Sequence, residues 1–329
     1  MKKFLSLLLS LSLALSLSIP AFAANNRDTI PEHISTFVST RNENASVSDV
    51  VPMYDTNNNI IAWLYTLDPV GYIVEDSSHE IIIEFSMTSA FERSNDKLYY
   101  GGPTQFYTKA SDNFVNIQSD SVVPLSEVSS NIRQFTATTR VVLSDNGNSI
   151  APLANTPPYS LDKNKFQTYD YNNDGRCGSV AAAILLAWYN DNGYSNLVSS
   201  SMYSNDVTFT NYLYPHIEGL SSSTGSSTAD LVSGLNWYLK TKNFSSKLSA
   251  VSLSNGRFST YTKKIDNNTP VILDLNAEPT YNEHWVVGYG YDYDQIVVKY
   301  NEFAICDDGW GNLDININWK YVGDLVYLK

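Results

Sequence analysis

The sequence predicts an α+β protein, and three observations lead to this class. Short runs rich in Ile, Val, Tyr and Trp alternate with Asn/Asp/Ser turns over residues 50–118. Two helix patterns follow, one over residues 179–189 and one from Ser227, before strand patterns return over residues 270–328. Helices followed by strands, with no internal repeat, are typical of an α+β domain rather than of a βαβ repeat.

The chain begins with the pattern of a secretory signal peptide. Met1-Lys2-Lys3 is basic, the next residues up to Pro20 are apolar, and Ala21-Phe22-Ala23 offers small residues for cleavage after Ala23. We expect residues 1–23 to be removed and the protein to be secreted, either extracellular or associated with the cell wall. An uncleaved membrane anchor is the alternative, although the stretch is short for a span.

The charge of the chain restricts its partners. There are 21 Lys and Arg residues against 34 Asp and Glu residues, and loss of Lys2 and Lys3 leaves 19 against 34, a net charge of −15. An acidic protein of this kind does not favour nucleic acid or anionic membrane surfaces. We therefore expect no nucleic-acid partner and no membrane partner once the signal peptide is gone.

Residues 24–150 are predicted to form a β-rich domain. A short helix should follow Pro31, and three hairpins are expected at 51–54 with 60–67, 71–75 with 81–87, and 98–100 with 105–107. His33 and His79 are interpreted as surface residues, because no nucleophile or metal-ligand pattern lies near them. Residues 144–158 are rich in Gly, Pro and Asn, so they predict a boundary to a second domain at 151–329.

The second domain is organised around Cys177. Residues 179–189 are apolar on nearly every side, which predicts a buried helix with Cys177 in its first turn. The N-terminal end of a helix lowers the pKa of a thiol and favours the reactive thiolate. A buried structural thiol is the alternative.

Further elements are predicted after this helix. Ser227-Thr228-Ala229-Asp230 has the spacing of a helix N-terminus, and a short helix is expected over 258–265. Strands are expected at 270–275, 284–291, 295–300, 302–306 and 320–328.

A histidine and a pair of aspartates complete a possible reactive group. His284 opens an alternating strand, and Asp307 and Asp308 stand beside Gly309-Trp310-Gly311. A cysteine nucleophile needs an imidazole to take its proton, and the imidazole needs a third group to hold its ring. The chain supplies these residue types in the order Cys, His, Asp.

These motifs resemble the papain-like cysteine peptidases, in particular the secreted bacterial streptopain-like and bacteriocin-leader-peptidase-like branches. Cys177-Gly178-Ser179 is similar to the opening of the nucleophile helix, His284 to the histidine that begins a strand, and Asp308-Gly309-Trp310-Gly311 to the Asn-Ser-Trp-Gly turn. The resemblance covers about residues 158–329. It implies a central Cys helix packed on an antiparallel sheet, with Cys177 as nucleophile, His284 as base and acid, and Asp308 as the orienting residue.

The resemblance also implies a preceding pro-domain that acts as an intramolecular inhibitor, and a protein or peptide substrate. Two departures are visible. Asp308 stands where the family usually has Asn, with Asp307 as an adjacent competitor. The family's oxyanion Gln has no counterpart a few residues before the nucleophile, so Gln167, ten positions upstream, is the first choice. Asn172 and Asn173 remain alternatives, with the Cys177 N–H as the other donor.

Two structural alternatives remain open. Cys177 and Cys306 are the only cysteines of an exported chain and could form a disulfide, which would remove the nucleophile. Residues 170–175 match the first half of a calcium loop, but position twelve is Ala181 rather than Glu. We therefore expect a tight polar turn, no metal and no cofactor.

The hypothesis for function is a secreted cysteine endopeptidase made as an inactive precursor. It would use a Cys-His-Asp triad and an acyl-enzyme thioester. Another Cys-His acyl transfer is the first alternative, either a cell-wall peptide amidase or a transglutaminase-like reaction. A non-catalytic exported binding or adhesion module is the second.

Overall fold

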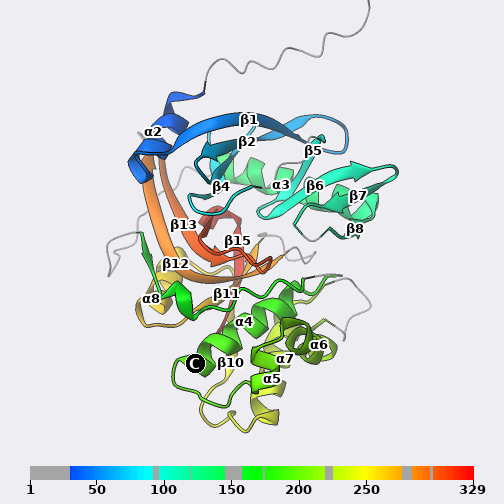
Figure 1. The fold of residues 1–329 in the computed structure, drawn as a ribbon, viewed down its shortest axis with the longest axis vertical. Helices are drawn as coiled ribbons and strands as arrows, with labels where there is room; N and C mark the ends of the chain where they lie inside the picture. The colour runs from blue at the N-terminus through cyan, green and yellow to red at the C-terminus, as the bar shows by residue number, and fades with distance from the viewer. Residues whose placement is uncertain are drawn as a thin grey trace, which may run out of the picture.

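The computed structural model describes residues 30–91, 96–118, 120–144, 158–172, 175–218, 225–275, 284–296 and 299–329. These residues form one large, mostly antiparallel sheet with helices packed on both of its ends (Figure 1). The α+β class is confirmed.

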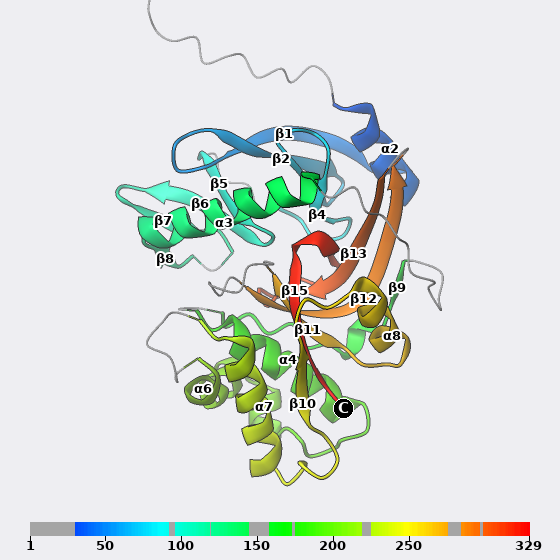
Figure 2. The same cartoon turned by 180° about the vertical axis from the view of Figure 1, so that it is seen from behind.

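The N-terminal half contains eight short strands and two helices within the described residues. Its elements are α2 (Glu32–Arg41), β1 (Ser46–Tyr54), β2 (Ile60–Asp68), β3 (Tyr72–Asp76), β4 (Ile82–Ser86), β5 (Leu98–Gly102), β6 (Gln105–Ala110), β7 (Asn113–Asn116), β8 (Val122–Val123) and α3 (Leu125–Ser144). The three predicted hairpins are present as β1–β2, β3–β4 and β5–β6. The sequence prediction missed α3, which packs against β5 and β7 (Figure 2).

The C-terminal half places most of its helices before its strands. Its elements are β9 (Tyr159–Ser160), α4 (Cys177–Asp191), α5 (Ser200–Tyr203), α6 (Asp206–Ile217), α7 (Thr228–Thr241), β10 (Ala250–Leu253), α8 (Phe258–Asp266), β11 (Val271–Leu275), β12 (Trp285–Ile296), β13 (Lys299–Asp307), β14 (Ile315–Asn318) and β15 (Val322–Leu328). Helix α7 begins as predicted, because Ser227 and Asp230 form a reciprocal capping box. The strand runs predicted over 284–306 are two long strands, β12 and β13.

Helix α4 is the central helix of the C-terminal half. All of its residues from Cys177 to Tyr189 are buried, as the all-round apolar pattern predicts. It packs on α6 and α7 and against β11 and β12. The helix is therefore fixed on several sides, and its first residue has little freedom to move.

The two halves share one sheet. Strand β4 of the N-terminal half pairs antiparallel with β14, with Phe85 opposite Asn316 and Glu84 opposite Ile317. The order across the junction is β12-β13-β14-β4-β3-β2-β1. This pairing joins strands more than two hundred residues apart, and the sequence prediction of two separate domains did not include it.

Side chains reinforce the junction between the halves. Arg41 forms an ion pair with Asp292 at 3.0 Å. Ser89 Oγ donates to the Leu313 carbonyl at 3.0 Å, and Phe135 stacks on Tyr321. The N-terminal half is thus attached to the turn after β13 as well as to the sheet.

Some predicted segments lie outside the described residues. They are the signal peptide at 1–23 and most of the boundary segment at 144–158. In the part of the chain that the structure describes, no helix combines the length and hydropathy needed to cross a bilayer.

Candidate active site

Cys177 is the first residue of α4 and lies at the base of the site. Its side chain is free, and so is that of Cys306, which is buried in β13 opposite Gly288 and Ile315. The disulfide alternative is therefore wrong for this structure. The backbone N–H groups of Trp285 and Gly178 act on the Cys177 sulfur and lower its pKa. Because Trp285 follows His284 directly, α4 and β12 meet at the nucleophile.

The Cys177 thiol is protonated in this conformation. Burial raises its pKa most, the Glu218 carboxylate raises it further, and the two N–H groups lower it, which leaves the pKa at about 12. The expected thiolate is absent because the helix end is buried and has a carboxylate beside it. The helix dipole alone does not decide the ionisation state of the thiol.

His284 is held by a backbone carbonyl. Its Nε2 lies 2.7 Å from the carbonyl oxygen of Asp308, and its ring stacks on Trp310 with 5.7 Å between the ring centroids. A carbonyl oxygen can only accept, so Nε2 carries the proton and Nδ1 is the free basic nitrogen of the neutral ring. Burial lowers the His284 pKa to about 4, so the ring is neutral at pH 7.

The carboxylate of Asp308 shapes a turn and does not hold the His284 ring. It accepts hydrogen bonds from the Trp310 N–H at 2.8 Å, the Asn312 N–H at 3.1 Å and the Asn312 side-chain amide at 2.9 Å. The structure thus brings Asp308 to His284 as predicted, but the contact runs through the main chain. Burial raises the Asp308 pKa to about 6, and these hydrogen bonds oppose the rise.

The neighbouring Asp307 does not contact the ring through any hydrogen bond among the described residues. Its Oδ1 accepts the Gly309 N–H at 2.9 Å, and its buried Oδ2 has no partner in that part of the chain. Burial and the nearby Asp308 raise its pKa well above the usual range for aspartate. Asp307 therefore closes the same turn from the other side.

Gln167 lies far from the nucleophile. Its side-chain amide donates to the Tyr203 hydroxyl at 2.6 Å, and that hydroxyl donates to Asp191 in the last turn of α4. A helix rises about 1.5 Å per residue, so the 15 residues of α4 place this group roughly 20 Å from Cys177. The structure does not bring Gln167 to the site.

Asn172 lies closer to the site. It is buried, and its side-chain Nδ2 has no hydrogen-bond partner within the described residues. A Cβ placed on Gly309 would lie 3.5 Å from this nitrogen and 3.5 Å from Val180 in the first turns of α4. The amide is thus a buried donor beside the turn at residues 307–312. Asn173, the other alternative, is outside the described residues.

The predicted polar turn before Cys177 is described in part. Asp206 in the first turn of α6 accepts the Tyr171 N–H at 3.2 Å and the Asp170 N–H at 3.4 Å. Asp174, which the half-matched calcium loop requires, is outside the described residues. Among those that are described, no three His, Cys, Asp or Glu side chains are grouped to hold a metal ion.

Sequence reasoning missed Glu218. It follows α6, a helix that the sequence prediction did not include, and its carboxylate reaches Ser179 in the first turn of α4. The two residues are 39 positions apart, so no local spacing connects them. Only the packing of α6 on α4 brings them together.

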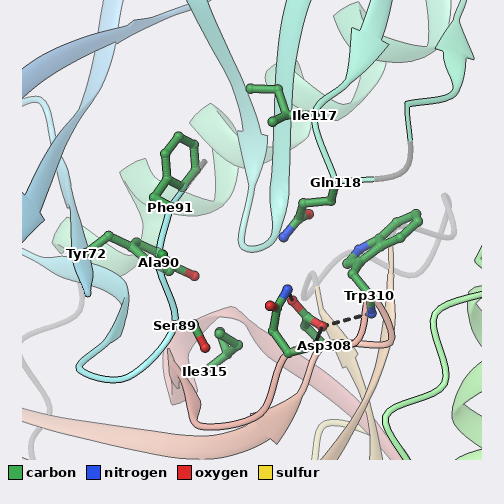
Figure 3. Close-up of a pocket in the computed structure, with 10 residues that line it drawn as sticks. Tyr72, Ser89, Ala90, Phe91, Ile117, Gln118, Asp308, Trp310 and Ile315 are labelled. Atoms are coloured by element: carbon green, nitrogen blue, oxygen red, sulfur yellow. Dashed lines mark hydrogen bonds between the residues drawn. The ribbon is translucent and has the colours of Figure 1, made fainter. Parts of the chain in front are cut away.

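A cavity of about 370 Å³ separates the turn at residues 307–312 from the N-terminal half (Figure 3). One wall consists of Asp308, Trp310, Asn312 and Ile315. The other consists of Tyr72, Ser89, Ala90, Phe91, Ile117 and Gln118, and Figure 3 shows the Gln118 side chain pointing into the space between the two walls. The N-terminal half therefore covers the turn whose carbonyl holds His284.

Known proteins were compared with the chain. Residues 161–324 match the Peptidase_C39 like family. None of the curated proteins compared with the chain matches it.

Two solved structures are similar at low identity. A prointerpain A fragment of Prevotella intermedia, mutant C154A, is 11% identical, with a TM-score of 0.44, over 84% of this chain and 97% of that one. UfSP from C. elegans is 11% identical, with a TM-score of 0.31, over 54% of this chain and 36% of that one.

The matched stretch contains all three residues of the predicted triad. Cys177 opens the buried helix of that stretch, His284 precedes its longest strand, and Asp308 follows the next strand. The C-terminal half of the chain therefore matches the Peptidase_C39 like family, and the predicted resemblance to the papain-like cysteine peptidases is confirmed.

Proposed function

We propose that the protein is a secreted cysteine endopeptidase that is made as an inactive precursor. One observation carries the proposal: helix α4, which Cys177 opens, packs against strand β12, whose first residue Trp285 follows His284 directly. The ring of His284 is held through Nε2, which leaves Nδ1 as the base. A thiol at the start of α4 and a base at the start of the strand packed on that helix are the parts that nucleophilic catalysis needs.

The reaction follows from these roles. His284 Nδ1 takes the Cys177 proton, and the sulfur forms a bond to the peptide carbonyl carbon while the carbonyl electron pair moves to oxygen. The Cys177 N–H and the Asn172 amide would donate hydrogen bonds to that oxyanion. The imidazolium then protonates the leaving amine as the C–N bond breaks. Water, deprotonated by His284, finally cleaves the thioester and restores the thiol.

The protonation states support an inactive precursor. The thiol has a pKa of about 12 and the imidazole a pKa of about 4, so neither is charged at neutral pH. Burial is the largest cause of both shifts. Removal of the N-terminal half would open the turn at Asp308 to water, and we expect this to move both pKa values toward a thiolate–imidazolium pair.

The central test is peptide hydrolysis by the chain that begins at residue 24, after an added serine protease has cut it between residues 144 and 158 and has been inhibited. Cys177→Ala should abolish cleavage of a quenched fluorescent protein substrate, whereas Cys306→Ala should keep it, because Cys306 lies in the sheet and away from the proposed reaction. Activity that survives Cys177→Ala would contradict the proposal. Intact mass spectrometry should show that both variants are cut to the same extent, and circular dichroism should show that both are folded.

Self-processing is tested separately. If the peptidase removes its own N-terminal half, pure wild-type protein should be cut between residues 144 and 158 and pure Cys177→Ala should remain whole. A cut in the pure Ala variant would show that another protease performs the step. Secretion is tested by N-terminal sequencing of the exported protein, which should begin at Ala24.

Other acyl transfers would use the same three residues, so the substrate separates them. A protein substrate, a cell-wall stem peptide and a glutamine peptide with an amine acceptor should be offered in parallel. Cleavage of the protein alone supports the endopeptidase. Release of stem-peptide amides would instead support a cell-wall peptide amidase, and incorporation of the amine would support a transglutaminase-like reaction. Failure of iodoacetamide to label Cys177 in the processed protein would favour a non-catalytic binding module.

A further inference from the structure

Glu218 is a buried carboxylate at the N-terminal end of the nucleophile helix. Its side chain is 2% exposed, its Oε1 accepts the Ser179 N–H at 2.7 Å, and the Ser179 hydroxyl donates to its Oε2. Ser179 is the third residue of α4, and the first N–H groups of a helix have no partner within it. Glu218 therefore supplies a cap that comes from a different helix.

The fit around this cap is tight. A Cβ placed on Gly178 would lie 2.9 Å from Glu218 Oε1 and 2.3 Å from Ser226 Oγ. Such distances leave no room for a side chain, so Gly178 is required by the approach of Glu218 and of Ser226. Cys177 precedes this glycine, and its position depends on the same turn.

We propose that Glu218 is a positioning residue for Cys177: its carboxylate fixes the turn that presents the sulfur, and its negative charge opposes formation of the thiolate. This inference rests on the proposed function, since it gives Cys177 the role of nucleophile. It adds that ionisation of one buried carboxyl regulates the nucleophile.

Few charged groups among the described residues act on Glu218 and Cys177. Arg176 lies before α4 and favours the ionised form of Glu218. Burial raises the pKa of Asp274 on β11 to about 8, so this group adds a second negative charge near Cys177 only above that pH, in wild type and variants alike. Burial raises the Glu218 pKa to about 7, against the hydrogen bonds from Ser179. Above about pH 7 Glu218 is therefore charged and opposes the thiolate. Below that pH it is neutral and the opposition disappears.

The rate of alkylation by iodoacetamide tests this without requiring peptidase activity. Full-length Glu218→Gln keeps an oxygen for the Ser179 N–H and removes the charge. We expect Glu218→Gln to be alkylated about tenfold faster than wild type above pH 8, which corresponds to a thiol pKa lower by about one unit. The ratio should approach one below pH 6, where Glu218 is protonated in wild type. Cys177→Ala in each background gives the blank for Cys306.

Glu302→Gln is the matched control. Burial also raises the pKa of Glu302 to about 7, but this residue lies on β13 opposite Tyr293, away from the nucleophile. The ratio of its alkylation rate to that of wild type should stay near one at every pH. A merely structural Glu218 would give a ratio that is constant with pH, and this result would overturn the proposal.

A second variant covers the case in which Glu218→Gln does not fold. Glu218→Asp keeps the charge and withdraws it by one methylene. The alkylation rate relative to wild type should therefore rise less above pH 8 than it does in Glu218→Gln. An unchanged ratio in Glu218→Asp would equally overturn the proposal. Alkylation that depends on Glu218 in a protein without peptidase activity would leave this inference standing and would remove only the proposed function.

Discussion

The two halves of the molecule use histidine in opposite ways. In the N-terminal half, His33 and His79 both contact the buried carboxylate of Glu75, His79 at 2.7 Å, and the Tyr65 hydroxyl donates to the same group at 2.8 Å. In the peptidase half, His284 contacts only a backbone carbonyl among its hydrogen-bond partners in the described residues. The histidines that touch a carboxylate are thus the ones outside the proposed active site.

The difference teaches that a His–carboxylate contact does not mark the reactive residue. Glu75 connects α2 and the β3–β4 turn to the sheet, and the side chains of His33 and His79 remain 30% and 41% exposed. They therefore lie at the surface, as predicted, and they also link elements of the N-terminal half through Glu75. His284 is 3% exposed, and the carbonyl fixes which of its nitrogens holds the proton. For a general base, this control of the tautomer matters more than a charged neighbour.

The largest expected effect follows directly from this contrast. His284→Ala should lower kcat/KM for a peptide substrate by at least about a thousandfold, because proton transfer in both steps is lost. His79→Ala should leave kcat/KM unchanged, since Glu75 remains bonded to Tyr65 and His33. A loss of activity in His79→Ala with an unchanged Tm would mean that the contrast between the halves is wrong.

Two buried groups, Glu84 in the N-terminal half and His284 in the other, should contribute to stability with opposite pH dependence. Burial raises the Glu84 pKa from 4.5 to about 8, so the folded chain keeps a proton that the unfolded chain releases. The stability that Glu84 contributes to the folded protein is complete below about pH 4.5 and is lost as pH rises to about 8. Burial lowers the His284 pKa from 6.5 to about 4, so its contribution is lost as pH falls through that range.

Denaturant unfolding at several pH values measures both effects. The free energy of unfolding of the wild-type protein should fall by a value on the order of 4 kcal/mol between pH 4.5 and pH 8 because of this group. Glu84→Gln should not show this fall. His284→Gln should instead flatten the curve between pH 4 and pH 6.5. If the Glu84→Gln curve keeps the wild-type slope above pH 5, this carboxyl is not protonated in the folded protein.

A smaller effect tests the oxyanion donor. Asn172→Ala should lower kcat by about 10²–10³ with little change in KM, because the lost hydrogen bond is made to the transition state. Gln167→Ala is the matched control at the far end of α4 and should leave kcat unaltered. The reverse result would restore Gln167 and would require α4 or its flanking loop to be arranged differently in the active enzyme.

The smallest effect concerns Asp308. Since its carboxylate accepts only N–H groups from Trp310 and Asn312, the amide oxygen of Asp308→Asn can replace most of these contacts. We expect less than a tenfold loss in kcat/KM, whereas a carboxylate that orients the ring directly would cost about 10⁴ on the same change. A large loss in Asp308→Asn would show that its side chain turns to His284 after processing.

Patterns that are local in the sequence were predicted well. The apolar run after Cys177 and the Ser227–Asp230 pair each act within one helix, and both helices are present. The hairpins at β1–β2, β3–β4 and β5–β6 were also predicted, because short turns connect their strands. Helix α6 was missed although Phe209, Leu213 and Ile217 recur at a spacing of four, because Pro215 lies inside it and the surrounding segment is rich in Ser and Tyr.

Features that depend on distant segments were not predictable. The β4–β14 pairing and the approach of Glu218 to Ser179 join residues with no common pattern. The main-chain contact of Asp308 with His284 was hidden for another reason. Every residue has a carbonyl, so the sequence cannot show which one holds a ring. The choice of Gln167 followed the family resemblance and failed to reach the site because Tyr203 and Asp191 hold it at the other end of α4.

The ladder between β4 and β14 has a consequence for maturation. A cut between residues 144 and 158 would sever one covalent connection and none of the hydrogen bonds or ion pairs between the halves. The two fragments would therefore migrate together on size exclusion until dilution, denaturant or further digestion separates them. Onset of activity would then lag behind chain cleavage, with a delay set by the dissociation rate of a noncovalent complex.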